Sequence, residues 1–341
     1  MDAVDALNEI AFWLERALAP AFKVQAFRKA AGIIQDLPAA DVAERARTKR
    51  LTSLKGIGGR SAEVIGQAVA GVVPDYLENL RQRGTEPLTS GGHELRAQLR
   101  GDLHAHSDWS DGSTSIELMM AAARTLGREY QALTDHSPSL TIANGLSGDR
   151  LAEQLDVLAS LSDPAAATGV RVLTGIEVDI LEDGRLDQTP ELLSRLDIVV
   201  ASVHSKLRAD TLSMTQRMLA GVRDPHTNVL GHCTGRLVSG TRGTRPPSTF
   251  DADQVFAACA ENDVAVEINS RPERQDPPDD LIRVALAAGC LFSIDTDAHA
   301  PGHLDFLAYG AERAQAAGVP ADRIVTTWPV DKLLAWSRAD R

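Results

Sequence analysis

Two histidines one residue apart, His104 and His106, end a short apolar segment, and the carboxylate of Asp111 follows five positions later. Imidazole and carboxylate groups are ligands that suit zinc, manganese and iron. A His-x-His pair is also common in polar turns. The segment by itself therefore leaves two interpretations open, a fragment of a metal site and a solvated turn.

Six further short apolar segments also carry a His, Asp or Glu at their carboxyl ends. The seven predicted strands are 101–106, 130–136, 171–179, 197–204, 228–233, 264–269 and 290–299, and stretches of helical period separate them. This alternation predicts βα units around a parallel sheet, and in an α/β barrel the carboxyl ends of the strands converge on one face. We expect that face to collect nine metal ligands: His104, His106, Asp111, His136, Glu177, His204, His232, Asp297 and His299.

Nine ligands are too many for one ion, so the sequence predicts two or three divalent ions, with Mn²⁺, Zn²⁺ and Fe²⁺ as candidates. Clustered ions of this kind activate water and offset charge at a phosphoryl group, which favours phosphoester hydrolysis. Arg236 and Arg274, each just past a strand end, are candidate phosphate-binding residues. Ordinary surface arginines are the alternative interpretation for both.

The composition, with 43% apolar and 24% charged residues, is that of a globular protein. No apolar run approaches the ~20 residues of a membrane span, and the acidic, amphipathic N-terminus does not resemble a signal peptide. Three cysteines without paired spacing argue against a disulfide framework. We therefore expect a cytoplasmic protein with no membrane partner.

Residues 1–71 have helical periodicity, and residues 72–99 contain scattered turn signals that predict a linker. Residues 1–100 carry a net charge of +2, with 14 Lys or Arg against 12 Asp or Glu, whereas the rest of the chain carries −14. A glycine hairpin between two helices lets a phosphate approach helix N-terminal N–H groups. The candidate DNA-binding residues are Arg47, Lys49, Arg50, Lys55, Gly56, Gly58 and Arg60.

The segments "DLHAHSDWSDGS", "LTDHS", "GIEVDILEDGRLD", "VVASVHS" and "DTDAHA" occur in the order found in PHP (polymerase and histidinol phosphatase) domains. Residues 100–341 thus resemble the PHP domain at the C-terminus of bacterial family X DNA polymerases. The resemblance implies an α/β fold, a distorted seven-stranded (β/α)7 barrel like a TIM barrel, with a trinuclear site. Arg271 stands where the family motif often has asparagine.

The resemblance also implies how the ions are shared. One ion would take His104, His106, Glu177 and Asp297; Glu177 would bridge to a second ion held by His204 and His232; a third would take Asp111, His136 and His299. Glu177 and Asp297 are accordingly the predicted catalytic carboxylates, alongside Arg236 and Arg274.

The segment "FKVQAFRKAAGIIQDLP" and the following hairpin "LKGIGGRSAEVIGQAV" resemble the small all-α N-terminal domain of DNA polymerase beta, a helix-hairpin-helix module that binds DNA ends. Such a hairpin is also compatible with a bound monovalent cation. Val64 stands at the position of the family's Schiff-base lysine, so lyase activity is not expected. Residues 72–100 leave no room for a polymerase domain, so we expect no DNA synthesis.

Three functions are compatible with these features. A metal-dependent 3′–5′ exonuclease or 3′-end-processing nuclease of DNA repair accounts for both modules. A small-molecule phosphatase of the histidinol phosphatase type accounts for the barrel alone. A metal-stabilised DNA-binding adaptor accounts for the N-terminal module but leaves a complete ligand set without a role.

Overall fold

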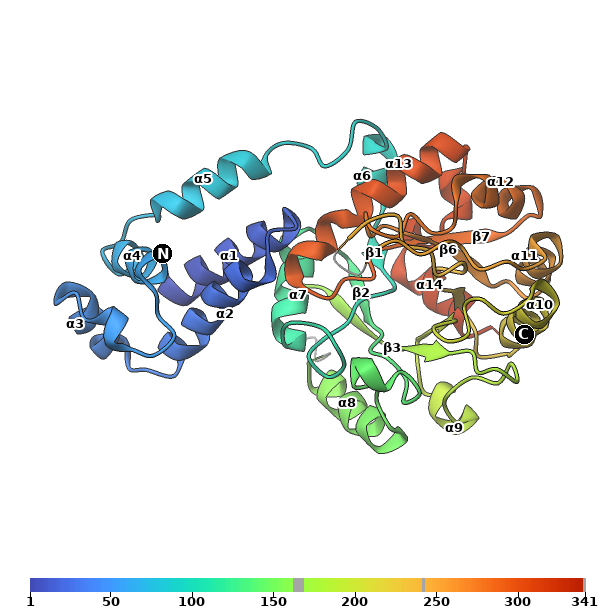
Figure 1. Cartoon of the computed structure of the whole chain (residues 1–341), viewed down its shortest axis with the longest axis horizontal. Coiled ribbons are helices and arrows are strands. Elements are labelled where there is room, and N and C mark those ends of the chain that lie inside the picture. The colour runs from blue at the N-terminus through green and yellow to red at the C-terminus, as the bar shows by residue number, and fades with distance from the viewer. Residues whose placement is uncertain (162–168, 241–242, 340–341) are drawn as a thin grey trace. The chain divides into compact units, whose positions relative to one another are not determined.

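The computed structural model describes residues 1–161, 169–240 and 243–339 (Figure 1). The chain divides into two compact units, Met1–Pro87 and Leu88–Arg341, here called the helical unit and the barrel unit. The described residues contain no helix long and apolar enough to cross a membrane.

The helical unit contains α1 (Ala3–Arg16), α2 (Ala21–Gln35), α3 (Ala39–Arg47), α4 (Gly59–Val69) and α5 (Asp75–Gly84). Pro20 and Pro38 immediately precede α2 and α3, where a residue without an N–H and with a fixed φ starts a helix at no cost. Apolar side chains of α1, α2, α4 and α5 form one core, which includes the fully buried Leu7, Ile65 and Leu77.

The structure differs from the predicted linker over residues 72–99. Residues 75–84 form α5, which packs on the helical-unit core through Leu77 and pairs Arg81 with Glu9, with 2.6 Å between Nε and Oε1. Residues 93–98 form α6 (His93–Gln98), whose Leu95 belongs to the barrel-unit core. The Gly, Pro and Thr residues of this segment suggested a continuous loop, but its few leucines are enough to dock two short helices.

The barrel unit contains seven strands: β1 (Gly101–Asp102), β2 (Tyr130–Leu133), β3 (Arg171–Asp179), β4 (Ile198–Ser202), β5 (Val229–Leu230), β6 (Ala265–Asn269) and β7 (Leu291–Asp295). They form one sheet in chain order, and each pair of neighbours is parallel. All seven predicted strands are confirmed, each within its predicted segment.

The seven-stranded sheet curves into a nearly closed barrel. Its two ends meet just beyond β1 and β7, where Ala105 and Ala298 form a parallel bridge and the His106 N–H donates to the Ala298 carbonyl at 2.8 Å. This closure places the β1 ligands beside those that follow β7. The predicted α/β barrel with an all-α N-terminal module is thereby confirmed.

Helices surround the barrel (Figure 1). They are α7 (Ile116–Thr125), α8 (Gly148–Leu161), α9 (Pro190–Leu193), α10 (Thr211–Val222), α11 (Ala252–Glu261), α12 (Asp279–Ala287), α13 (Leu307–Ala317) and α14 (Val330–Ser337). One buried cluster joins strand residues such as Tyr130 and Ile198 to Leu333 of α14. An apolar core in the barrel therefore supports the strands whose carboxyl ends carry the polar residues.

Candidate metal centre

The nine predicted ligands lie together at the carboxyl ends of the strands. His104 and His106 follow β1, His136 follows β2, Glu177 lies in β3, His204 follows β4, His232 follows β5, and Asp297 and His299 follow β7. With Asp111 they form four overlapping groups. Within each group, the potential ligand atoms lie within 4.8 Å of one another. Most are buried, while Asp111, His204 and His299 keep some exposure. The barrel therefore brings together residues up to 195 positions apart in a single cluster.

Glu177 is the centre of the cluster. Its Oε1 lies 2.7 Å from Nε2 of His232 and 3.2 Å from Nε2 of His204. Its Oε2 lies 2.9 Å from Nδ1 of His136 and 3.3 Å from Nε2 of His104. Because each carboxylate oxygen faces a different pair of histidines, Glu177 has the geometry of a ligand that bridges two ions.

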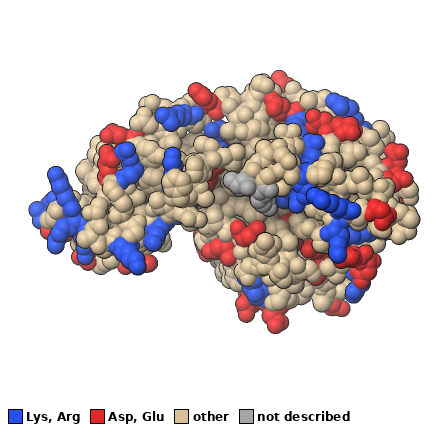
Figure 2. All heavy atoms as spheres, in the orientation of Figure 1, with Lys and Arg blue, Asp and Glu red and all other residues tan. Residues whose placement is uncertain are grey.

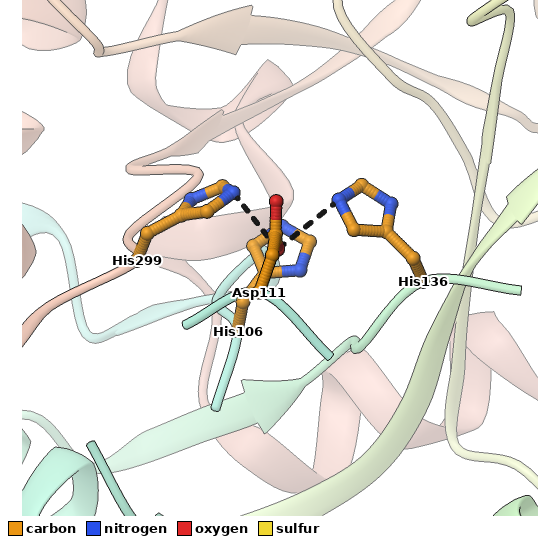
Figure 3. A group of neighbouring side chains, drawn as sticks. All are labelled: His106, Asp111, His136 and His299. Atoms are coloured by element: carbon orange, nitrogen blue, oxygen red, sulfur yellow. Dashed lines mark ion pairs between the residues drawn. The ribbon is translucent and has the colours of Figure 1, made fainter. Parts of the chain in front are cut away.

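Asp111 forms the more exposed end of the cluster (Figure 3). Its carboxylate lies between the rings of His136 and His299, with Oδ1 3.5 Å and 3.3 Å from their Nε2 atoms. The ring of His106 stacks on that of His136 at a centroid distance of 4.4 Å and lies tilted against that of His299 at 4.2 Å. Figure 3 shows these side chains arriving from three separate strand ends and pointing toward one another.

The residues fit divalent metal ions on two grounds. Two N or O ligands bonded at ~2.1 Å to one ion are about 3.0–3.4 Å apart, and several of the separations above fall in that range. Buried nitrogen atoms of His104, His106, His204 and His232 also lack a hydrogen-bond partner among the described residues. Since buried polar groups are nearly always satisfied, these nitrogen atoms are suited to ligate a cation.

In the metal-free cluster the carboxylates are held ionised and His106 neutral, whereas the pKa values of His104 and His204 are raised, because the attraction of Glu177 outweighs the opposing effect of burial. Burial by itself would raise the pKa of Glu177, but the surrounding histidines, with His104 first, hold that pKa well below its usual value. Burial is likewise outweighed at Asp297, whose pKa is held well below its usual range chiefly by Arg274. Burial and the neighbouring His299 hold the pKa of His106 well below its ordinary value. Ionised carboxylates and a neutral imidazole are the protonation states that ligate metals.

Comparison with known proteins agrees with this geometry. Residues 102–271 match the model of the PHP domain. This segment of the chain is a PHP domain. Residues 1–71 match a helix-hairpin-helix domain. The PHP domain of this chain, in which the candidate ligands lie together, is a metal-dependent hydrolase domain.

Among the relatives, a DNA polymerase/3′-5′ exonuclease PolX of Bacillus subtilis is 37% identical over 246 residues, which cover 71% of this chain and 42% of that protein. The chain thus spans less than half of that relative. Probable phosphatases of Aliivibrio fischeri and Escherichia coli are each 26% identical, over 69% and 67% of this chain and 91% and 90% of theirs. A histidinol phosphate phosphatase of Lactococcus lactis, solved with zinc, L-histidinol and phosphate, aligns with a TM-score of 0.44 at 18% identity, covering 64% of this chain and 92% of that one.

Two carboxylates that the sequence reasoning missed support the histidines of the PHP domain. Glu267 of β6 is fully buried and lies 2.6 Å from Nδ1 of His104, and Asp179 lies 2.6 Å from Nδ1 of His204. A carboxylate on Nδ1 orients the ring and leaves Nε2 for a metal. Their signal was available, because each is an acidic residue within a predicted strand, near its carboxyl end.

The two predicted phosphate-binding arginines differ in position. Arg274 is buried and its Nε donates to Oδ2 of Asp297 at 2.8 Å, so it contacts the cluster directly. Arg236 is half-buried, and its Nε donates to the backbone carbonyls of Arg274 and Gln275. Arg236 therefore supports the loop that carries Arg274.

In the helical unit the predicted hairpin lies between a short 3₁₀ helix, Leu51–Ser53, and α4. Gly56 has φ +108°, and a Cβ there would lie 2.6 Å from Cε of Lys29, so the turn requires glycine. Gly58 is exposed at the N-cap of α4, where the described residues supply no side-chain cap. The first N–H groups of α4 therefore remain available to a ligand.

The predicted basic side chains are exposed around this hairpin, and Figure 2 shows Lys and Arg gathered over α3. Acidic neighbours pair with some of them: Arg47 lies 2.8 Å from Glu44, and Arg60 lies 2.8 Å from Glu63. Lys49, Arg50 and Lys55 are exposed as well. Val64 is fully buried in the helical-unit core, so this position presents no nucleophile to a ligand.

Proposed function

We propose that this protein is a metal-dependent phosphoesterase that acts on DNA 3′ ends, as a 3′–5′ exonuclease or 3′-end-processing nuclease in DNA repair. The observation that carries the proposal is the presence, in one chain, of an assembled ligand cluster and a helix-hairpin-helix unit with an open helix N-terminus. We expect no DNA synthesis, because only residues 72–101 separate the two matched regions.

Two or three divalent ions, Mn²⁺ first among the candidates, would be held by the nine residues and would supply an activated water and charge neutralisation at phosphorus. The chain's own residues prepare this site. Glu267 and Asp179 fix the rings of His104 and His204, so that each Nε2 is directed into the cluster. Arg274 holds Asp297 ionised and oriented through a charge-assisted hydrogen bond.

The helical unit would supply affinity for the DNA backbone. Unpaired N–H groups at the start of α4 and exposed basic side chains near it are suited to phosphate oxygens. Because the unit is covalently tethered, its binding raises the effective concentration of a DNA end at the PHP domain without any new contact there. The PolX relative is named as a polymerase and a 3′-5′ exonuclease, which supports this choice of substrate.

The experiment is incubation of Mn²⁺-loaded protein with 3′- and 5′-labelled oligonucleotides. We expect the 3′ label to be released as small products, while the 5′ label remains on fragments that shorten progressively. Release of the 5′ label first, or no turnover with any divalent ion, would contradict the proposal.

A small-molecule phosphatase is the second candidate. The match to proteins named as probable phosphatases covers 90% and 91% of their own length. A phosphatase of this kind would need the barrel unit but not a DNA-binding unit. A turnover of histidinol phosphate or another small monoester far above the nuclease rate would favour this candidate.

A further inference from the structure

We propose that Arg271 is a substrate-binding residue of the PHP domain, whose guanidinium binds a phosphoryl oxygen at the exposed end of the cluster. This inference rests on the proposed phosphoesterase activity and names a residue that determines how the phosphate is held.

The position of Arg271 is fixed by the strand before it. Arg271 directly follows β6 and Ser270, and its backbone N–H donates to Oδ1 of Asn269 at 3.0 Å. Its side chain is only 12% exposed, and Nη1 lies 3.3 Å from Nδ1 of His299. The guanidinium therefore lies beside the Asp111 end of the cluster, where the candidate ligands are most exposed.

The contact with His299 does not satisfy this guanidinium. Nδ1 of His299 also lies 2.8 Å from the carbonyl oxygen of Asp297. A carbonyl only accepts, so Nδ1 carries the proton and donates to it, and Nε2 is left for a metal. With its lone pair absent, Nδ1 offers Arg271 no acceptor.

Carboxylates near Arg271 are too distant to replace that acceptor. Among the described residues the closest are Oε2 of Glu273 at 3.7 Å and Oδ1 of Asp297 at 3.9 Å. Two other arginines of similar burial are paired at hydrogen-bonding distance: Arg274 with Asp297 at 2.8 Å and Arg313 with Asp279 at 2.8 Å. Arg271 thus differs from both in lacking a close anion.

A largely buried guanidinium without an anionic acceptor carries a desolvation cost that a bound anion would relieve. A phosphoryl group held by the metal centre brings oxygen atoms to this end of the cluster. The planar fork of arginine matches two such oxygens, which a lysine ammonium cannot do. The guanidinium of Arg271, with its nearest carboxylates at 3.7 and 3.9 Å, is therefore placed to bind the substrate phosphate.

The test measures binding of inorganic phosphate to the Mn²⁺-loaded full-length protein by titration calorimetry, in wild type and in Arg271→Gln, Arg271→Lys and Arg313→Gln. Metal content per chain and melting temperature are measured for each variant. Arg313→Gln is the matched control, because Arg313 is also 12% exposed but holds a carboxylate, that of Asp279, at 2.8 Å.

We expect Arg271→Gln to weaken phosphate binding about tenfold, which corresponds to ~1.4 kcal/mol, with metal content unchanged. Arg271→Lys should give an intermediate loss, and Arg313→Gln none. Wild-type phosphate affinity in Arg271→Gln would overturn the inference, and so would a loss of metal in that variant, which would indicate a structural role. Weakened phosphate binding without any DNA cleavage by the wild type would keep the role of Arg271 and refute the DNA substrate.

Discussion

Replacement of Glu177 by glutamine removes one negative charge and leaves the shape of the side chain unchanged. Glu177 is 1% exposed and faces four histidine nitrogens within 3.3 Å. An amide offers one carbonyl oxygen and one NH₂ group, so the variant cannot bridge two ions through two oxygens. The NH₂ group would also face ring nitrogens that must keep their lone pairs for metal.

The expected losses form a graded series. Loss of an outer partner such as Glu267, which contacts Nδ1 of His104 and the backbone N–H of His232 but no ring nitrogen that faces Glu177, costs ~10–100-fold in metal affinity or activity. Glu177, in contrast, contacts the candidate ligands directly through both of its carboxylate oxygens. We therefore expect Glu177→Gln to lose more than ~100-fold in kcat and at least one ion per chain. Glu182, with a side chain 68% exposed, is the carboxylate control that should change nothing.

The assay measures metal content by mass spectrometry, kcat on a small phosphate ester and circular dichroism for Glu177→Gln, Glu267→Gln and Glu182→Gln. The fold should persist in all three, because residues at the carboxyl ends of barrel strands serve the site rather than the core. A folded Glu177→Gln variant with wild-type metal content and turnover would refute the bridging assignment. Equal losses in Glu177→Gln and Glu267→Gln would refute the graded argument.

Reversal of Arg47, Lys49 and Arg50 to Glu should weaken DNA binding at low salt and flatten its salt dependence, with hydrolysis of a small aryl phosphate unchanged; wild-type DNA affinity with an unchanged salt slope in the variant would argue against the hairpin. Deletion of residues 1–87 should lower the rate on oligonucleotides far more than on small esters, since the barrel unit has its own core; equal losses on both would indicate an unstable truncation. In chelated protein, burial lowers the pKa of His204 but Glu177 and Asp179 raise it to about 9. The protonated ring therefore stabilises the fold fully below pH ~6.5, and this contribution is lost as the pH rises through about 9. Melting temperatures across that range should fall less in Glu177→Gln than in wild type.

The strands and the ligand types were predictable because they are local properties of the chain. Alternation of apolar runs with helical stretches reports parallel βα units, and a polar residue at each strand end reports the face on which the strands converge. For this reason His136 and His232, which lie far apart in the chain, could be assigned to one site without any structure. The helix-hairpin-helix was predictable on the same basis, from helical periodicity around a glycine turn.

Packing decided what local pattern could not. Leu77 and Leu95 anchor two helices in a segment whose turn residues predicted a linker, since docking depends on a surface elsewhere in the chain. Arg236 and Arg271 are both arginines near strand ends, but Arg236 donates to two backbone carbonyls, whereas the nearest carboxylate to Arg271 is 3.7 Å away.

The sequence by itself determined the set of candidate ligands and the barrel that positions them, because residue type and periodicity are written along the chain. Only the tertiary structure decided which ring nitrogen of a histidine faces a supporting carboxylate such as Glu267 and which faces the other candidate ligands. That choice depends on closure of the barrel, which places Asp297 and Glu267 against residues more than 160 positions away. Contacts of this range are set by the summed packing of seven strands, and no local pattern records them.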